Sequence, residues 1–199
     1  MTTTATGQAP GTVPAPAEPR DDVVTDERRY LTFTLQDELY AIDILQVTEI
    51  IEFRSLTVVP MMPPFIRGVL NLRGRVLPVV DLAARFEHGA TEVRRRTAVI
   101  VVRAGGEGTA TQDVGVMVDG VNKVIHLGAD DIEPPPAFGA GVRTDFISGM
   151  ARADAGFLIV LNTAQVLAGA AELADAVRAD AVRADAVRAD ARADGEAGG

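Results

Sequence analysis

The chain has 199 residues, a formal net charge of -9, no cysteine and a single lysine, Lys123. The lack of thiols excludes disulfides and cysteine-based metal or nucleophilic sites, and the acidic balance argues against nucleic acid or anionic membranes as partners. No apolar run approaches the roughly 18 residues of a membrane helix, and the N-terminal segment carries no signal-peptide core. We therefore expect a soluble, cytoplasmic protein.

Both ends of the chain differ in composition from its middle. Residues 1–29 are rich in Thr, Ala and Pro and show no apolar periodicity, which predicts a disordered arm. Residues 175–199 contain a five-residue repeat, Ala-Val-Arg-Ala-Asp. Because five residues turn a helix by roughly 500°, the valines of successive repeats share no face. The sequence predicts a solvated low-complexity tail and leaves residues 30–174 as the folded domain.

The folded part opens with a pattern typical of short strands. In residues 30–35, Leu and Phe alternate with Thr at a period of two, as in a half-buried strand. Residues 39–42 predict a second strand, 43–47 a short helical turn, and 48–52 a third extended segment. Within the last segment, Glu49 stands among apolar neighbours, and the default interpretation places its side chain on the solvent face of a strand.

Residues 68–81 predict a β-hairpin, because two apolar runs flank an Arg73-Gly74 pair. Gly74 lacks a Cβ and can adopt the positive φ of a tight turn, which would lift Arg73 at the tip. Two interpretations of Arg73 follow. It is either a solvated surface arginine or a guanidinium presented to a partner.

The remaining segments predict more strands and one helix. Asp81 is placed to cap a short helix over 82–86, and Asp119-Gly120 to form a turn. Asn162 or Thr163 is placed to cap a terminal helix, whose apolar residues recur at helical spacing. The predicted strands are 97–102, which is apolar throughout and therefore central, then 113–118, 121–127, and the hairpin formed by 146–152 and 156–161.

About ten short strands and one C-terminal α-helix predict an all-β fold. Halves of roughly 70 residues could barely stabilise themselves alone, so we expect two small barrels that share a packed interface.

No catalytic constellation stands out. His88 and His126 are far apart in sequence, and no phosphate-binding loop follows the glycines at 105–108. We therefore expect no metal, no cofactor and no enzymatic activity. A small β-barrel enzyme that uses Asp81 or Asp119 as its acid is the alternative from another class, although capping explains both aspartates.

Taken together, five blocks of sequence closely resemble the CheW family of chemotaxis coupling proteins, and the resemblance covers nearly all of residues 30–174. The blocks that carry it are Phe33-Thr-Leu35 with Tyr40-Ala-Ile-Asp-Ile-Leu45, Val47-Thr-Glu-Ile50, the hairpin over 65–82, Val114-Gly-Val-Met-Val-Asp-Gly-Val121 and Phe157-Leu-Ile-Val-Leu161.

This resemblance implies a fold and a function. The fold would be two SH3-like five-stranded β-barrels around a common core. The function would be a non-enzymatic adaptor that bridges methyl-accepting chemoreceptors, at their cytoplasmic tip, and the regulatory domain of a CheA-type histidine kinase. The adaptor would be recruited to membrane-associated receptor arrays. A detached kinase regulatory module and a coupling protein of a non-flagellar pathway, serving pili or development, are the alternatives within this class.

The resemblance also implies roles for individual positions. Phe138 matches a second kinase contact, and Glu133 stands where relatives often carry a basic residue, which weakens the expectation of that contact and of ring-shaped arrays. The positions that match the surface for the kinase and receptor are Val47, Glu49, Gly68 and Arg73. We add Asn71, Leu72 and Gly74 of the hairpin as further interaction candidates.

Overall fold

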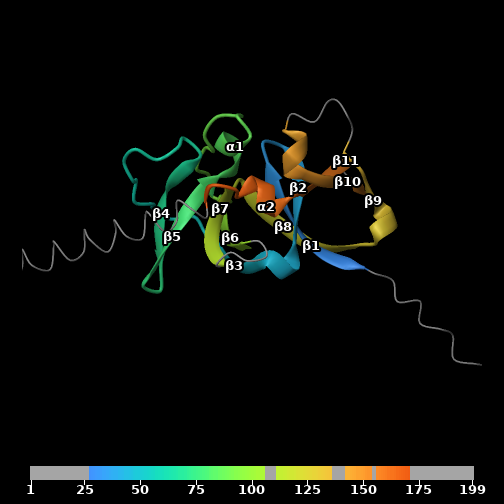
Figure 1. Ribbon diagram of the computed structural model, residues 1–199, viewed down its shortest axis with the longest axis horizontal. Coiled ribbons are helices and arrows are strands. Elements are labelled where there is room, and N and C mark those ends of the chain that lie inside the picture. The colour runs from blue at the N-terminus through green and yellow to red at the C-terminus, as the bar shows by residue number, and fades with distance from the viewer. Residues whose placement is uncertain (1–26, 106–110, 136–141, 154–155, 171–199) are drawn as a thin grey trace, which may run out of the picture.

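The computed structural model describes residues 27–105, 111–135, 142–153 and 156–170. The chain forms two β-sheets with a few short helical turns (Figure 1). The larger sheet has the strand order β8 (Gly120–Leu127), β1 (Arg28–Leu35), β2 (Glu38–Asp43), β11 (Gly156–Leu161), β10 (Ile147–Ala153) and β9 (Ile132–Glu133). The smaller sheet has the order β3 (Val47–Glu52), β6 (Ala98–Ala104), β7 (Gln112–Val118), β5 (Arg75–Asp81) and β4 (Ile66–Leu72).

The all-β fold with two packed subdomains is confirmed. The larger sheet contains six strands where five were expected, because the two-residue strand β9 adds to its edge. Over the described residues, the pairing within each sheet runs in open order, and the two end strands of a sheet form no ladder with each other. The subdomains are therefore curved sheets, with no closed barrel among the paired strands.

The order of the strands shows that the subdomains are interleaved along the chain. The chain leaves the larger sheet after β2, builds the whole smaller sheet with β3 to β7, and returns to the larger sheet at β8. Two parallel pairings, β2 with β11 and β5 with β7, join strands that are distant in sequence. Asp119 therefore lies where the chain crosses between sheets, and the expected turn there does not form a hairpin.

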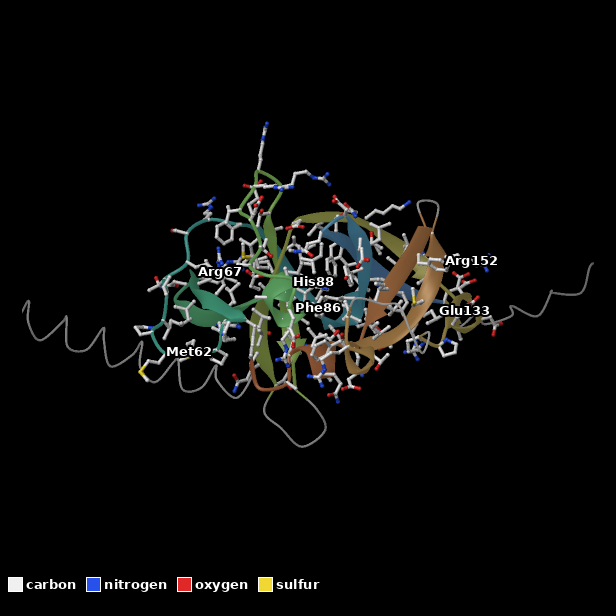
Figure 2. All side chains as sticks on the ribbon, turned by 90° about the horizontal axis from the view of Figure 1, so that it is seen from above. Met62, Arg67, Phe86, His88, Glu133 and Arg152 are labelled. Carbon is white, nitrogen blue, oxygen red and sulfur yellow. The ribbon has the colours of Figure 1, made fainter. Side chains whose placement is uncertain are left out.

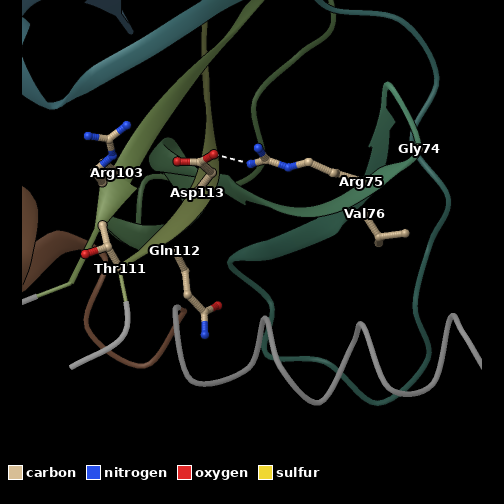
Figure 3. Close-up of a pocket in the computed structure, with 7 residues that line it drawn as sticks. All are labelled: Gly74, Arg75, Val76, Arg103, Thr111, Gln112 and Asp113. Carbon is tan, nitrogen blue, oxygen red and sulfur yellow. Dashed lines mark hydrogen bonds and ion pairs between the residues drawn. The ribbon is translucent and has the colours of Figure 1, made fainter.

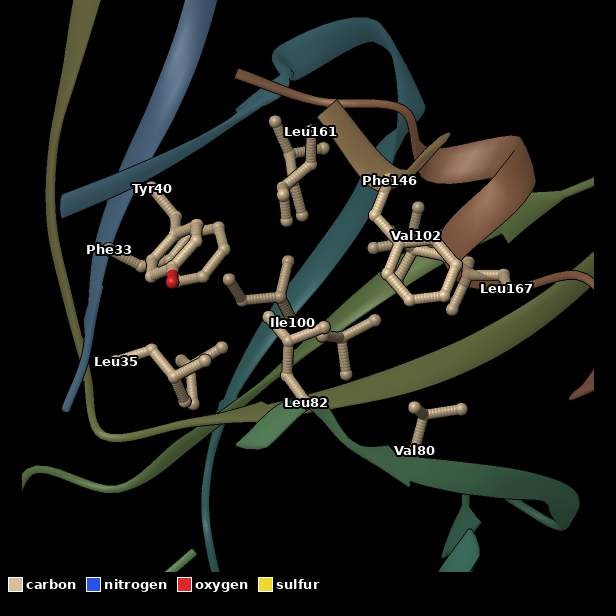
Figure 4. Close-up of a cluster of buried hydrophobic side chains, with 14 of the residues drawn as sticks. Phe33, Leu35, Tyr40, Val80, Leu82, Ile100, Val102, Phe146, Leu161 and Leu167 are labelled. Atoms are coloured by element: carbon tan, nitrogen blue, oxygen red, sulfur yellow. The ribbon is translucent and has the colours of Figure 1, made fainter. Parts of the chain in front are cut away.

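The main hydrophobic core lies between the two sheets (Figure 4). The period-two alternation of β1 sends Leu31, Phe33 and Leu35 into this core, where the smaller sheet contributes Val80 and Ile100. Smaller clusters fill the opposite face of each sheet, one around Leu158 and Val160 and one around Val99 and Met117. Because the main core draws on both sheets, neither subdomain has a complete core of its own.

Within the described ranges, five short helical elements connect or follow the strands. They are η1 (Ile44–Gln46), α1 (Leu82–Arg85), η2 (Ala129–Asp131), η3 (Thr144–Phe146) and α2 (Thr163–Val166). Asn162 caps α2 by accepting a hydrogen bond from the Gln165 amide at 3.3 Å, as predicted. The later turns expected for this helix lie outside the described residues.

Arg85 fastens the two helices together. Its Nε donates to the Val166 carbonyl at 2.9 Å and its Nη2 to the Ala168 carbonyl at 3.1 Å. Its guanidinium carbon also lies 4.4 Å from the centre of the Phe65 ring. Burial, followed by the nearby charge of Arg143, lowers the pKa of Arg85 below its ordinary value. This side chain joins the end of the smaller sheet to the C-terminal part of the domain.

Strands β1 and β10 begin at other residues than the sequence predicts. Strand β1 begins at Arg28, inside the expected arm, because Arg28 and Arg29 pair with Leu127 and His126 of β8. Phe146 is the last residue of η3, and β10 begins at Ile147.

In the part of the chain that the structure describes, no helix is long and apolar enough to span a membrane.

Candidate protein-interaction surface

The predicted hairpin over 68–81 is confirmed as β4 and β5 joined by a two-residue turn. Arg73 has a φ of 53° and Gly74 a φ of 82°, the pair of positive values that defines a type I′ turn. Asn71 fixes the turn, because its Oδ1 accepts a hydrogen bond from the Gly74 amide at 2.9 Å. The Arg73 side chain is 78% exposed at the tip.

Glu49 does not lie on the solvent face of its strand, so the default interpretation is wrong. In β3, Val47, Glu49 and Ile51 are half-buried, whereas Thr48, Ile50 and Glu52 are exposed. The pairing of β3 with β6, which shifts register between Val47 and Glu49, decides which face is covered. The Glu49 side chain is 31% exposed, and the apolar side chain of Ile50 is the one that faces solvent.

An ion pair joins Glu49 to the hairpin tip. Arg73 Nη2 donates to Glu49 Oε1 at 3.0 Å. Strands β3 and β4 are the two end strands of the smaller sheet, so this contact means that the sheet curves until its edges approach each other. An exposed pair of this kind contributes at most about 1 kcal/mol to stability. Its main effect is to hold an acid and a guanidinium side by side.

Gly68 is buried under the segment that follows β3. Its φ is +150°, and a Cβ there would lie 2.5 Å from the Thr57 carbonyl oxygen. Thr57 and Val69 exchange backbone hydrogen bonds of 2.9 and 2.8 Å, which holds that segment on the edge of β4. A larger side chain at Gly68 would therefore displace the segment that contains Thr57, and would affect the interaction surface only indirectly.

Of the other predicted residues, Val47 and Leu72 lie on the strands that carry or adjoin the ion pair, and Phe138 is not among the described residues. Val47 and Leu72 are half-buried on β3 and β4. Leu45, which is 80% exposed, and Ile50, which is 46% exposed, are apolar residues of this region that the sequence prediction missed. The available signal was the apolar pair Ile44-Leu45, because a single turn cannot bury both side chains. Phe138 lies outside the described residues.

A pocket of about 590 Å³ lies beside the turn (Figure 3). Figure 3 shows the Arg75 guanidinium extended to Asp113 of β7, with which it forms an ion pair. Gly74 and Arg103 also line the pocket. The hairpin, β6 and β7 therefore place several charged groups around this pocket, a composition suited to electrostatic recognition.

The two aspartates of the enzyme alternative serve the fold. Asp81 is fully buried, caps α1 by accepting from the Ala84 amide at 3.3 Å, and accepts from the Thr91 amide at 2.9 Å and hydroxyl at 2.7 Å. Asp119 Oδ2 accepts from the Gln36 amide at 2.7 Å. Among the described residues, no group of three or more His, Asp or Glu side chains could hold a metal ion.

The hairpin surface and the position of Glu133 are far apart. Figure 2 shows Glu133 at one end of the molecule and Arg67 and Met62 at the other. Glu133 is exposed on β9, the edge strand of the larger sheet. A partner at Glu133 would thus use a surface separate from the hairpin.

Replacement of Gly74 tests the geometry of the turn. We expect Gly74→Val to lower the free energy of unfolding by about 1 to 2 kcal/mol, because a β-branched residue resists positive φ. A Cβ at this position meets no atom within 4 Å, so the effect would come from the backbone alone. Gly74→Asn is the matched control, since Asn adopts this conformation readily. Equal urea midpoints for both variants would contradict the turn.

Comparison with known proteins identifies the family. The model of the CheW-like domain matches residues 29–171. A chemotaxis protein CheW of Klebsiella aerogenes is 36% identical over 140 residues, which cover 70% of this chain and 81% of the relative. Protein FrzA of Myxococcus xanthus is 30% identical over 127 residues, which cover 64% of this chain and 76% of that protein.

A solved structure supports the same assignment. The crystal structure of the scaffolding protein TtCheW from Thermoanaerobacter tengcongensis is similar, with a TM-score of 0.63 and 34% sequence identity. The match covers 70% of this chain and 87% of the scaffolding protein. By family model, sequence and fold, the chain belongs to the CheW family of coupling and scaffolding proteins.

Proposed function

We propose that this chain is a non-enzymatic adaptor that couples methyl-accepting chemoreceptors to a CheA-type histidine kinase. The observation that carries the proposal is the Arg73–Glu49 pair, held at 3.0 Å at the tip of a type I′ hairpin in a member of the CheW family. A guanidinium and a carboxylate in fixed relative positions can set the register of a partner that carries complementary charges.

The surface divides into residues that touch the partner and residues that hold them in place. Arg73, Glu49 and the neighbouring apolar side chains of Val47 and Leu72 make the contacts. The exposed Ile50 extends this apolar area. Asn71 and Gly74 fix the turn, Asn71 through its side-chain oxygen and Gly74 through its positive φ. Gly68 lets the segment at Thr57 pack against β4.

Membership of the CheW family supports a proposal for the partners and the place of action. The regulatory domain of the kinase and the cytoplasmic tip of the receptor bind at the hairpin end of the molecule. We include a further kinase contact at Phe138, a residue outside the described ranges, in this proposal. The adaptor works in the cytoplasm at membrane-associated receptor arrays, with residues 30–174 as the working domain and no cofactor.

Protein FrzA supports a second candidate, in which the chain couples receptors in a pathway with an output other than flagella. This candidate uses the same surface and differs only in the receptor and kinase. The genes that neighbour this one distinguish the two outputs, and they also distinguish an adaptor from a detached kinase regulatory module.

Reconstitution tests the proposal. The full chain is mixed with the purified kinase and a membrane-inserted receptor from the same organism, and kinase autophosphorylation is measured. We expect receptor control of the kinase to require this chain and to saturate with its concentration. The chain alone should hydrolyse no ATP. Receptor control that is equally strong without the chain would contradict the proposal.

A further inference from the structure

The larger sheet contains a second pocket, and none of the predicted interaction residues lines it. Its volume is about 600 Å³, within the range of small-molecule sites. Residues of β8, β2, β10 and β11 line it, among them Leu39, Ile125 and Leu158. Figure 2 shows Arg152, one of its lining residues, at the end of the molecule opposite Arg67 and Met62.

The inner wall of this pocket is apolar. Leu127 and Leu158 are buried members of the hydrophobic cluster on this face of the larger sheet. Leu39, Ile125 and Ala153 pack against the same cluster but are only partly covered. The pocket is therefore continuous with a hydrophobic cluster, and apolar surface is incompletely buried inside it.

The pocket opens where the larger sheet is incomplete. Strand β8 is an end strand and pairs only with β1. On the other side, β9 pairs with Met150 and Ala151 of β10 but not with Arg152 or Ala153. Residues of β8 and the end of β10 line one pocket, so these two edges face each other across it.

The charge of the pocket is opposite to that of the protein. Its ionisable lining residues are Lys123, His126 and Arg152, and no described carboxylate lines it, although the chain has a net charge of -9. Lys123 and Arg152 are exposed and form no ion pair with any described residue. Asp154, which follows in sequence, lies outside the described residues. The rim thus offers two cations without a partner in the described part of the chain.

We propose that this pocket binds an amphiphilic organic carboxylate, with its apolar chain or ring against Leu39, Ile125 and Leu158 and its carboxylate at Lys123 and Arg152. An apolar wall with a few polar groups at the mouth is the usual composition of a small-molecule site. The cations orient the ligand, and burial of its apolar part supplies most of the affinity.

Titration of the full chain with decanoate, below the concentration at which it forms micelles, tests the proposal. We expect saturable binding of one decanoate per chain by calorimetry. Butyrate, which lacks most of the apolar chain, and decyltrimethylammonium, which reverses the head charge, should each bind at least about tenfold more weakly. Amide shifts in ¹⁵N spectra should change at β8 and at the end of β10.

Variants separate the two parts of the site. The double variant Lys123→Gln, Arg152→Gln should bind decanoate about tenfold more weakly and remain folded, because both side chains are exposed. Ala153→Phe should block the pocket and abolish binding. Arg95→Gln, at an exposed arginine outside the pocket, is the matched control and should bind as the unmodified chain does.

Three results would overturn the proposal. The first is equal binding of decanoate and decyltrimethylammonium. The second is a set of amide shifts that maps to Leu45 and Ile50 and leaves β8 unchanged. The third is binding of an extended acidic peptide, Ac-Val-Asp-Val-Asp-Val-NH₂, without binding of decanoate, which would assign the open edges to strand addition instead.

Discussion

We expect Arg73→Glu to weaken binding of the kinase regulatory domain or the receptor tip by roughly thirty-fold or more, without unfolding the protein. Loss of one partner from a desolvated charge pair at an interface costs about 2 to 5 kcal/mol of binding free energy. The effect on stability should stay within about 1 kcal/mol, because the Arg73 side chain is 78% exposed and its pair with Glu49 is a surface pair. Titration calorimetry and thermal melting measure the two effects.

Two further variants show what the partner recognises. Arg73→Asn removes the charge but keeps a residue that adopts positive φ, so it separates loss of charge from distortion of the turn. The exchange variant Glu49→Arg, Arg73→Glu restores an ion pair with its ends reversed. If the partner recognises the guanidinium at the tip, the exchange variant should bind as weakly as Arg73→Glu.

The control is Arg95→Glu, which changes the net charge equally at an exposed arginine of the loop before β6. It should bind within about twofold of the unmodified chain, since a distant exposed charge is screened by salt. If Arg73→Glu bound both partners as tightly as Arg95→Glu, the hairpin would be an ordinary surface turn and the site assignment would be wrong.

A second large effect is expected at Asp81. Asp81→Asn should lower the free energy of unfolding by about 3 kcal/mol, although the side chain keeps its shape. Asp81 Oδ1 accepts from the Ala84 amide and the Thr91 hydroxyl, and Oδ2 accepts from the Thr91 amide and lies 3.7 Å from Arg67 Nη1. Asn has only one acceptor oxygen. Its NH₂ group would therefore meet the donors that now face Oδ2.

Thermal unfolding measures this effect, which for a chain of this size corresponds to a shift of about 6 to 12 °C in the midpoint. Asp119→Asn is the matched control, because the Asp119 side chain accepts a hydrogen bond from the Gln36 amide and Asn still offers an acceptor there. An Asp81→Asn protein with an unchanged midpoint would show that the buried carboxylate does not hold α1 and the Thr91 segment in place.

The stability experiment also bears on the enzyme alternative. An acid used in a reaction needs free access to a substrate, whereas Asp81 is fully buried and its oxygens are already engaged by backbone and side-chain donors. We therefore expect Asp81→Asn to reduce partner binding only as far as it reduces the folded fraction.

Local chemistry explains why the hairpin and the caps could be predicted. The Arg73-Gly74 turn requires a residue that accepts positive φ, and Gly74 meets that need within two residues of sequence. Asp81 and Asn162 cap helices through hydrogen bonds to amides three residues away. The period-two alternation of β1 predicts which of its side chains enter the core, but it does not show which side chains they pack against.

Resemblance to a family extended these predictions to residues whose roles no local pattern shows. Gly68 was named in this way, but the reason for a glycine there is the Thr57 carbonyl, which lies eleven residues earlier in the chain. Ile50 was missed, since nothing in the sequence says which apolar side chain of β3 stays uncovered once β3 pairs with β6.

The sequence by itself determined the all-β class, most strands, the turn at Arg73 and the caps, because these depend on contacts within a few residues. Only the tertiary structure decided the interleaving of the sheets, the covered face of β3 and the meeting of Glu49 with Arg73. The physical reason is the same in each case. Strand pairing and sheet curvature depend on hydrogen bonds and packing between distant segments, and a period-two pattern records which faces are apolar but not which strand lies beside them.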